Sequence, residues 1–475
     1  MLLFIFLYAF AQFSLVLNYR KIVLNDTRPD FDEYPHVTIQ LPVYNEKYVV
    51  KRLIEAVAEL DYPKGRMEIQ ILDDSVDETI GIIDETAALV KQKGIDIDVV
   101  RRPERTGYKA GALAYGLKGC KGEFVAIFDA DFIPKKDFLK KTVCFFKNPK
   151  IGMVQTKWEH LNQNFSFLTQ LQAFGLDAHF SIEQSGRNSN GHFINFNGTA
   201  GIWRKTTIED AGGWQSDTLT EDLDLSYRAQ LKGWEFKYLE NVGSPAELPA
   251  VMNALKTQQY RWTKGGAECA VKNLPKVFDN KELSWKTKIY ASFHLLNSLV
   301  FVCILLTGVL SLPMLYIKNS FPKFDFIFQM ASVFTLSFFF LAVFYWASQK
   351  EALKAKKLPF VSFILQFPLF LSIYMGLSLH NAIAVMEGYL GRKTAFVRTP
   401  KFNLVDKSDK WEGNKYIRKH VNPLTYIEML LALYFVGAIL VGVNMNDYGL
   451  LPFHIMLSGG FATVAIFSFM HSHKS

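Results

Sequence analysis

The sequence predicts an α/β domain built on a mixed, mainly parallel sheet, together with an α-helical transmembrane bundle. Of the 475 residues, 49% are hydrophobic and 21% are charged. This is too apolar for an ordinary soluble enzyme and too charged for a chain embedded entirely in a membrane. Short β-type runs alternate with helix-type stretches over residues 30–285, and long apolar segments lie on either side of them. The two parts are therefore interpreted separately.

The first apolar segment, residues 2–17, predicts an uncleaved membrane anchor. It lacks the basic start and the small-residue cleavage site of a signal peptide. Arg20 and Lys21 follow it directly. By the positive-inside rule, this basic flank and the residues up to 288 lie on the cytosolic side.

Four strands are expected in the next section, at residues 37–41, 68–72, 97–100 and 123–128. Helix-compatible stretches such as 48–60 and 80–93 separate them. Strands that alternate with helices predict a parallel-centred sheet, with ligands at the carboxyl ends of its strands. No P-loop motif and no Gly-x-Gly-x-x-Gly follows any of them, which argues against a P-loop ATPase and a dinucleotide-binding fold.

Acidic residues follow two of these strands. Asp129 and Asp131 come directly after the run 123–128, and two carboxylates at this spacing can approach one hard cation. Such an ion can hold a nucleotide diphosphate and neutralise it as it departs. A solvated turn is the alternative. It is weakened by Asp73 and Asp74, which end a neighbouring strand.

Two further motifs lie downstream. Thr220-Glu221-Asp222 precedes an amphipathic stretch, residues 223–231, where helix capping by Thr220 is the simpler local interpretation. Gln258, Arg261 and Trp262 lie close to one helix face. They combine an amide, a guanidinium whose N–H groups match phosphate oxygens, and an indole ring. They could serve a diphosphate and a sugar together, although an Arg-Trp pair is otherwise usually an anchor beside a membrane span.

The C-terminal half contains the remaining apolar segments. Residues 289–317, 324–347, 425–443 and 450–470 are each near the roughly 20 residues needed to cross about 30 Å of hydrocarbon. The run 359–385 has basic loops on both sides, which predicts an in-plane or re-entrant element; a sixth true span is the alternative. The expected organisation is an anchor (1–20), a cytosolic domain (30–285), a transmembrane hairpin (286–348), re-entrant or interfacial helices (359–387), a basic loop (388–423) and a C-terminal hairpin (424–471).

The distribution of charge and cysteine excludes several classes. The formal net charge is +8, and residues 388–423 hold nine Lys or Arg against three acids. One short basic loop is typical of a cytosolic segment that lies beside the membrane or binds phosphate. A nucleic-acid surface would need an extended basic face, so no nucleic-acid partner is expected. The four cysteines are far apart, which suggests neither a disulfide framework nor a zinc site and favours a reducing compartment.

Seven motifs follow one another along residues 35–270. They are Tyr44-Asn45-Glu46, Asp73-Asp74-Ser75, Gly107-Tyr108-Lys109-Ala110-Gly111, Asp129-Ala130-Asp131, Phe196-Asn197-Gly198-Thr199, Thr220-Glu221-Asp222 and Gln258-x-x-Arg261-Trp262. In this order they resemble the motifs of the processive family 2 glycosyltransferases, which include cellulose, chitin and hyaluronan synthases. The fuller sequence around them is most similar to the plant cellulose-synthase-like A group, the mannan and glucomannan synthases, and their bacterial relatives.

The resemblance implies a GT-A fold and an inverting transfer of a hexose from a nucleotide-sugar, GDP-mannose or UDP-glucose, to a growing β-linked polysaccharide, coupled to export. It assigns Asp222 as the general base, and Asp129 and Asp131 as the ligands of Mg²⁺ or Mn²⁺. The expected nucleotide-sugar contacts are Tyr44, Glu46, Asp73, Lys109, Asp129 and Arg261. The expected acceptor contacts are Trp262, Gln258 and Asn197, which stands where cellulose synthases carry Cys.

The basic loop contains a segment similar to the family's gating loop, F-x-V-T-x-K. Phe396, Thr399 and Lys401 match this pattern, whereas Arg398 replaces its Val. We expect the loop to close over the bound nucleotide. A positive-inside loop without a catalytic part is the alternative.

Three rival functions remain at the level of sequence. One is a non-processive enzyme that glycosylates a membrane lipid of the ceramide or polyprenyl-phosphate type. A scaffold with a decayed transferase domain is disfavoured by the intact acidic motifs. A glycosidase would not need Lys109 and Arg261 to bind phosphate.

The expected partners are a nucleotide-sugar donor, a glycan acceptor and membrane lipid, with an accessory export subunit as a further candidate. The expected location is a multi-pass protein of the cell inner membrane with a cytosolic catalytic domain.

Overall fold

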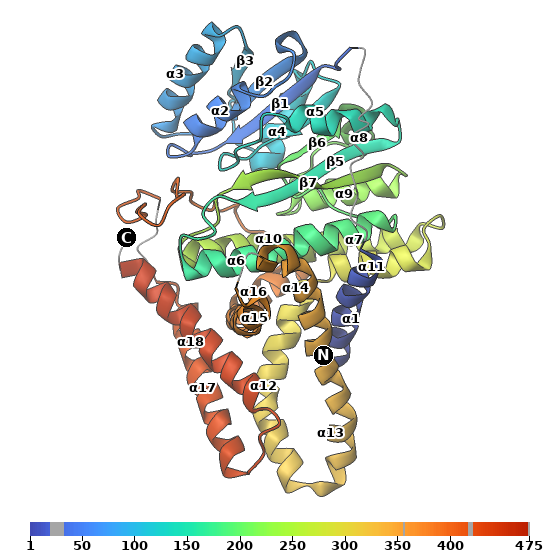
Figure 1. Ribbon diagram of the computed structural model, residues 1–475, viewed down its shortest axis with the longest axis vertical. Coiled ribbons are helices and arrows are strands. Elements are labelled where there is room, and N and C mark those ends of the chain that lie inside the picture. Colours follow the sequence, from blue (N-terminus) through green and yellow to red (C-terminus); the bar gives the residue numbers. More distant parts are fainter. Residues whose placement is uncertain (20–32, 355–356, 417–420, 474–475) are drawn as a thin grey trace.

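The computed structural model describes residues 1–19, 33–354, 357–416 and 421–473. It has an α/β domain at one end and long helices at the other, with a layer of helices between them (Figure 1). Parts of three expected segments lie outside the described residues: Arg20 and Lys21 after the anchor, residues 30–32 at the start of the cytosolic domain, and 417–420 in the basic loop.

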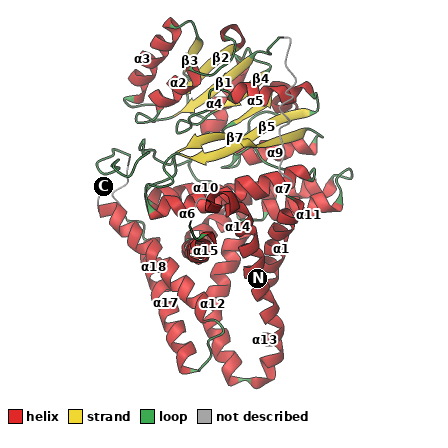
Figure 2. Ribbon diagram, viewed as in Figure 1, coloured by secondary structure: helices red, strands yellow, loops and turns green. Residues whose placement is uncertain are grey.

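A seven-stranded sheet forms the centre of the α/β domain, in the order β3-β2-β1-β4-β6-β5-β7 (Figure 2). The strands β3, β2, β1 and β4 are parallel, β5 and β7 are parallel, and β6 is antiparallel to both of its neighbours. The four expected strands and the mixed, mainly parallel sheet are confirmed. The strands are β1 (Val37–Val43), β2 (Met67–Asp73), β3 (Asp96–Val100), β4 (Phe124–Ile127), β5 (Ile151–His160), β6 (Gly201–Arg204) and β7 (Glu235–Ala246).

Helices cover both faces of this sheet, and its central strands are buried on both sides. Along β4, Phe124 and Ala126 pack into one hydrophobic cluster, whereas Val125 and Ile127 pack into the other. The first cluster contains residues of α2 (Val50–Ala58), α3 (Thr79–Gln92) and α5 (Phe138–Val143), and the second those of α4 (Tyr108–Lys118), α8 (Lys205–Asp210) and α9 (Glu221–Leu231). The helices expected at 48–60 and 80–93 correspond to α2 and α3. Short 3₁₀ turns are η1 (Lys64–Arg66) and η2 (Cys144–Lys147).

A helical layer lies beneath the sheet (Figure 1). It consists of α6 (Phe167–Ala178), a π-helical turn η3 (His179–Glu183), α7 (Gln184–Ser189), α10 (Met252–Asp279) and α11 (Trp285–Leu295). The apolar segment 289–317, expected to cross the membrane, is divided between the end of α11 and α12, and the helix that is long and apolar enough to span begins at Leu299. Ala291 and Leu295 of α11 pack instead against Tyr227 of the α/β domain. Hydropathy does not distinguish a helix face buried by protein from one covered by lipid.

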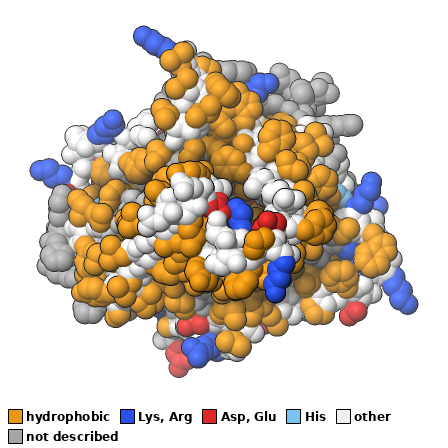
Figure 3. Space-filling model, turned by 90° about the horizontal axis from the view of Figure 1, so that it is seen from below, with side chains coloured by type: hydrophobic (Ala, Val, Ile, Leu, Met, Phe, Trp, Pro, Cys, Tyr) orange, Lys and Arg blue, Asp and Glu red, His pale blue; other side chains and the backbone are white. Residues whose placement is uncertain are grey.

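The membrane-type helices form the opposite end of the molecule. They are α1 (Leu2–Asn18), α12 (Leu299–Ser320), η4 (Pro322–Phe324), α13 (Asp325–Ala331), η5 (Ser332–Thr335), α14 (Leu336–Lys354), α15 (Pro359–Gly376), α16 (Ser378–Tyr389), α17 (Leu424–Asn444) and α18 (Leu451–His473). In the described chain, five helical segments are long and apolar enough to cross a bilayer. From below, this end is covered mainly by hydrophobic side chains (Figure 3). These features indicate an integral membrane protein.

The segment predicted to be in-plane or re-entrant forms two helices, α15 and α16. In Figure 1, α15 is seen nearly end-on, so its axis runs across those of α12 and α17. Its length and hydropathy would also allow a span. Its relation to the bilayer therefore stays a prediction.

A buried ion pair joins the helical layer to the membrane helices. Lys256 Nζ of α10 lies 2.6 Å from Glu428 Oε2 of α17, and both side chains are almost fully buried. His380 Nε2 of α16 lies 3.0 Å from the Lys256 backbone oxygen. The four cysteines are buried and free.

Candidate active site

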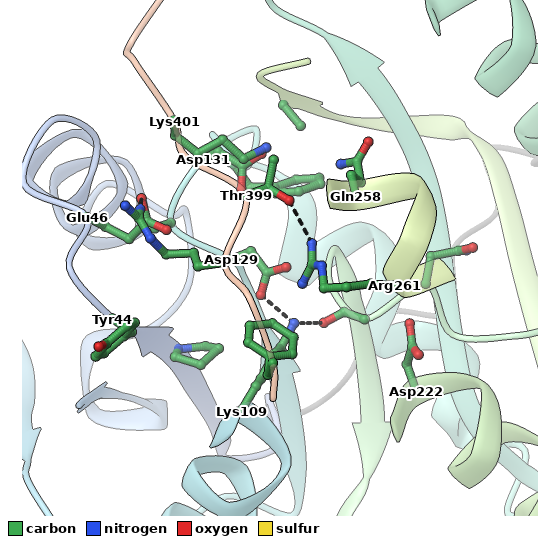
Figure 4. A pocket seen from close by; sticks show the side chains of 18 of the residues that line it. Tyr44, Glu46, Lys109, Asp129, Asp131, Asp222, Gln258, Arg261, Thr399 and Lys401 are labelled. Atoms are coloured by element: carbon green, nitrogen blue, oxygen red, sulfur yellow. Dashed lines mark hydrogen bonds and ion pairs between the residues drawn. The ribbon is translucent and has the colours of Figure 1, made fainter. Parts of the chain in front are cut away.

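One cavity at the carboxyl ends of the parallel strands brings together residues from distant parts of the chain (Figure 4). Its walls come from β1, the residues that follow β4, the helices α4, α9 and α10, the end of β5 and the basic loop. The predicted site residues that line it are Tyr44, Glu46, Lys109, Asp129, Asp131, Asn197, Asp222, Gln258, Arg261, Trp262, Phe396, Thr399 and Lys401.

Asp73 is the predicted nucleotide contact that does not line this cavity. Its Oδ2 lies 2.8 Å from Arg101 Nε, and its Oδ1 accepts a hydrogen bond of 2.9 Å from the Ser75 backbone N–H. Successive side chains of a strand point to opposite sides. Asp74 therefore faces the cavity instead, with its two carboxylate oxygens bound to Arg102 Nε at 2.8 Å and Nη2 at 2.6 Å.

Asp129 and Asp131 follow β4 and each pair with a lysine. Lys109 Nζ lies 2.5 Å from Asp129 Oδ1 and donates to the Gly198 carbonyl at 2.8 Å. Lys401 Nζ lies 2.6 Å from Asp131 Oδ2. Among the described residues, the second oxygen of each carboxylate has no hydrogen-bond partner.

This pair of carboxylates fits a hard divalent cation. Mg²⁺ is usually held in nucleotide sites by one or two carboxylates, while water and phosphate oxygens complete its shell. Both side chains line the same cavity, and each has an oxygen to offer. The described residues contain no cluster of three or more His, Cys, Asp or Glu that would form an all-protein metal cage.

Asp222 lies in the first turn of α9 and faces the same space. The neighbouring Gly198 has φ +80°, and a Cβ there would approach Asp222 Oδ2 to 3.0 Å, so this close contact requires glycine. Burial and the adjacent Glu221 carboxylate raise the pKa of Asp222 to about 7. Burial also raises the pKa of Glu221. Asp222 is therefore a carboxyl group that exchanges a proton near neutrality.

Thr220 is the N-cap residue of α9, as predicted, but its hydroxyl makes no capping hydrogen bond. The Thr220 Oγ1 instead lies 3.4 Å from Cys269 Sγ of α10. Thr220 therefore occupies the predicted N-cap position, but the predicted hydrogen bond from its hydroxyl to the start of the helix is not formed.

The α10 helix presents Gln258, Arg261 and Trp262 to the cavity. Arg261 Nη2 donates to Thr399 Oγ1 at 2.9 Å, and its guanidinium lies 4.7 Å from the centre of the Phe396 ring. Its Nε is buried and has no partner among the described residues. The guanidinium therefore retains an N–H donor in a cavity that is lined by four aspartates.

The basic loop crosses the cavity and is tied to it at several points (Figure 4). Phe396 stacks on Tyr108, with ring centres 5.7 Å apart. Arg398 Nη1 lies 2.6 Å from Glu46 Oε2. Burial raises the pKa of Glu46 to about 7, although Arg398 acts in the opposite direction. Lys401 also donates to the Glu247 carbonyl at 2.9 Å.

Several lining residues were not predicted from the sequence. Arg105 lies over the Tyr44 ring at 3.4 Å, and Trp158 and His160 reach the cavity from β5. Glu247 binds the backbone N–H groups of Phe402 and Asn403 at 2.8 and 2.9 Å. Trp158 and His160 are two residues apart on β5 and so share one face of the strand, whereas the other contacts join segments that no local pattern connects.

Residues 35–265 match the family described as "Glycosyltransferase like family 2". The chain is 44% identical over 274 residues to "Probable glucomannan 4-beta-mannosyltransferase 4" of Oryza sativa subsp. japonica, over 57% of this chain and 49% of that one. It is 40% identical over 296 residues to "Glucomannan 4-beta-mannosyltransferase 9" of Arabidopsis thaliana, over 59% of this chain and 55% of that one. The chain spans about half the length of the curated relatives it matches.

Among solved structures, the chain is similar to a mannosyltransferase from Pyrobaculum calidifontis in complex with GDP-Man and Mn²⁺. The TM-score is 0.52 at 18% sequence identity, over 82% of this chain and 96% of that one. At this identity the similarity concerns the fold. It confirms the predicted GT-A architecture of the α/β domain.

Proposed function

We propose that the chain is an inverting hexosyltransferase that extends a β-linked polysaccharide, because residues 35–265 match glycosyltransferase-like family 2. The observation that carries this proposal is the convergence of Asp129, Asp131, Asp222 and Arg261 on one cavity. Two carboxylates for a cation, one for a proton and a guanidinium for phosphate are the groups that this transfer needs.

The donor that we propose first is GDP-mannose, because the similar curated proteins are named as glucomannan 4-beta-mannosyltransferases. UDP-glucose is the second candidate, since a glucomannan contains both sugars. The nucleotide would lie at the end of the cavity lined by Tyr44, Glu46 and Arg105. A planar base fits beside the stacked Tyr44 and Arg105 side chains.

The transfer proceeds by one displacement. The acceptor hydroxyl attacks the anomeric carbon as the bond from that carbon to the diphosphate breaks, so the configuration inverts. The hydroxyl proton passes to the Asp222 carboxylate. With a pKa of about 7, Asp222 is a base matched to neutral pH.

The departing diphosphate gains negative charge, which Arg261 and Lys109 stabilise more in the transition state than in the ground state. Asp129 and Asp131 would hold the Mg²⁺ or Mn²⁺ ion, which supplies further neutralisation of the diphosphate. In the loop, Lys401 forms an ion pair with Asp131, and Thr399 accepts a hydrogen bond from Arg261. These side chains are thus within reach of the region where the phosphate oxygens would bind.

The acceptor would approach from the side of Trp262, Gln258 and Asn197. Indole rings stack on the apolar C–H faces of sugars, and both Trp158 and Trp262 line this cavity. These features support a glycan acceptor over the lipid acceptor of the rival hypothesis. The catalytic domain would face the cytosol, residues 359–387 would lie in or near the plane of the membrane, and the helices beneath would conduct the polymer outward, alone or with an export subunit.

Purified protein incubated with labelled GDP-mannose or UDP-glucose, Mn²⁺ and short β-mannan primers tests the proposal. We expect a product that lengthens with time, is cleaved by an endo-β-mannanase and is absent with the Asp222→Asn variant. Label that appears only as one sugar on an organic-extractable lipid would favour the lipid-glycosylating alternative. No transfer from either donor would refute the proposed function.

A further inference from the structure

A π-helical turn, His179–Glu183, connects α6 to α7 beneath the active site. Such turns are rare and are often found at functional sites. Its first and last residues contact each other: His179 Nδ1 donates to Glu183 Oε2 at 2.7 Å. The other ring nitrogen, Nε2, donates to Asn197 Oδ1 at 2.9 Å. The turn is thus linked to a residue of the cavity wall.

The neighbouring hydrogen bonds determine the orientation of the Asn197 amide. Asn195 Nδ2 also donates to Asn197 Oδ1, at 3.0 Å. Asn195 cannot be reversed without losing its own contact, because its Oδ1 accepts from Gln184 Nε2 at 3.3 Å. The backbone N–H of Asn197 donates to Gln155 Oε1 at 3.0 Å. The oxygen of the Asn197 amide therefore faces His179.

The amide nitrogen of Asn197 is left for a ligand. Within the described chain it makes one long hydrogen bond, of 3.4 Å, to the Asn195 carbonyl, and the amide group has a second N–H. Asn197 lines the cavity, and the next residue, Gly198, borders Asp222. The amide N–H groups thus lie on the side from which an acceptor hydroxyl must reach Asp222.

The charge of Glu183 stabilises this arrangement. Both ring nitrogens of His179 face oxygen atoms, of Glu183 on one side and of Asn197 on the other. Burial raises the pKa of Glu183, but Arg187 and His179 outweigh this effect and bring it to about 2. Arg187 Nη2 lies 3.7 Å from Glu183 Oε1. Glu183 therefore remains ionised beside the His179 ring.

We propose that His179 and Glu183 are positioning residues, which hold the Asn197 amide so that its Nδ2 donates a hydrogen bond to a hydroxyl of the acceptor sugar. This inference rests on the proposed function, since it concerns the acceptor of the same reaction. Sugar hydroxyl oxygens accept such hydrogen bonds. An amide that is already held in the binding orientation loses less conformational freedom when the acceptor binds.

The test compares acceptor and donor kinetics of the purified full chain with GDP-mannose and β-mannan oligosaccharides. His179→Ala is expected to raise the acceptor KM about tenfold, the usual effect of one hydrogen bond. The donor KM and the slow hydrolysis of donor without acceptor should stay within about twofold of wild type. His179→Gln retains an N–H donor and should recover most of the loss. His192→Gln is the matched control, because His192 pairs with Thr287 and stacks on Tyr290 away from the cavity.

A double-mutant cycle tests whether His179 acts through Asn197. In an Asn197→Ala background, the further change His179→Ala should leave the acceptor KM unchanged. Additive effects, or equal changes in the donor and acceptor constants, would overturn the inference while the transferase function stands. If wild-type protein neither transfers nor hydrolyses the donor, the proposed function fails and this inference fails with it.

Discussion

The ionisation of Asp222 links the chemistry of the site to its stability. The Asp222→Asn substitution removes the proposed base and should lower kcat by about 10²- to 10⁴-fold, the usual contribution of a positioned general base. The wild-type rate should also depend on pH, because only the ionised carboxylate accepts a proton. With a pKa of about 7, the carboxylate is the minor form below neutral pH and the major form above it. The rate should therefore rise with pH and level off above about pH 8.

The sign of the effect on stability is opposite to that on activity. The pKa of Asp222 is raised in the folded state, so between about pH 4 and 7 the folded protein binds more protons than the unfolded chain. Its stability should fall as pH rises through this range, by up to about 1.4 kcal/mol per pH unit for this one group. The carboxamide of the Asp222→Asn variant cannot ionise, so the variant should lose this pH dependence and melt at a higher temperature than wild type at pH 8.

Two measurements on purified protein check this reasoning: kcat from pH 5.5 to 8.5, and the melting temperature over the same range. Glu221 shares the titration with Asp222, so the profile reports the pair rather than one residue. Glu46→Gln is a useful comparison, because Glu46 also has a pKa of about 7. Wild-type turnover in Asp222→Asn, or a rate that does not fall below pH 7, would refute the assignment of Asp222 as the base.

Three further predictions concern the loop, the acceptor end and the membrane junction. Lys401→Ala should lower kcat about tenfold or more, because a charged hydrogen bond near the diphosphate is lost. Lys407 is exposed, and the control Lys407→Ala should leave kcat unchanged. Equal kcat values for the two variants would show that the loop has no catalytic part. Trp262→Ala should abolish elongation while the Kd for GDP, measured by calorimetry, stays within about twofold; an undiminished polymer yield would remove Trp262 from the acceptor site. Glu428→Ala should leave Lys256 buried without its partner and destabilise the protein by about 3–5 kcal/mol, seen as a lower melting temperature in detergent; an unchanged value would mean that water reaches the pair.

The parts of the fold that could be predicted from the sequence are those with a local signal. The strand β4 stands out as an apolar run, whereas β1 and β2 stand out because apolar residues alternate with polar ones along them. The acidic pair after β4 follows from the same reasoning, because the end of a buried strand opens onto a polar edge. The mainly parallel sheet and the GT-A fold were predicted on these grounds together with the resemblance.

The parts that could not be predicted depend on contacts between distant segments. Asp73 and Asp74 are adjacent, and only the register of β2 decides that Asp74 faces the cavity. The end of α11 at Leu295 reflects packing on Tyr227 rather than its own hydropathy. Glu247 binds the basic loop more than 150 residues away in sequence, and no local pattern indicates such a contact.

The most direct test of the account is a structure of the protein with GDP-mannose and Mn²⁺. The account predicts the ion between Asp129 and Asp131, the diphosphate within reach of Arg261 and Lys109, and the anomeric carbon on the side of Asp222. A nucleotide bound outside this cavity, or a metal ion that neither Asp129 nor Asp131 contacts, would contradict it.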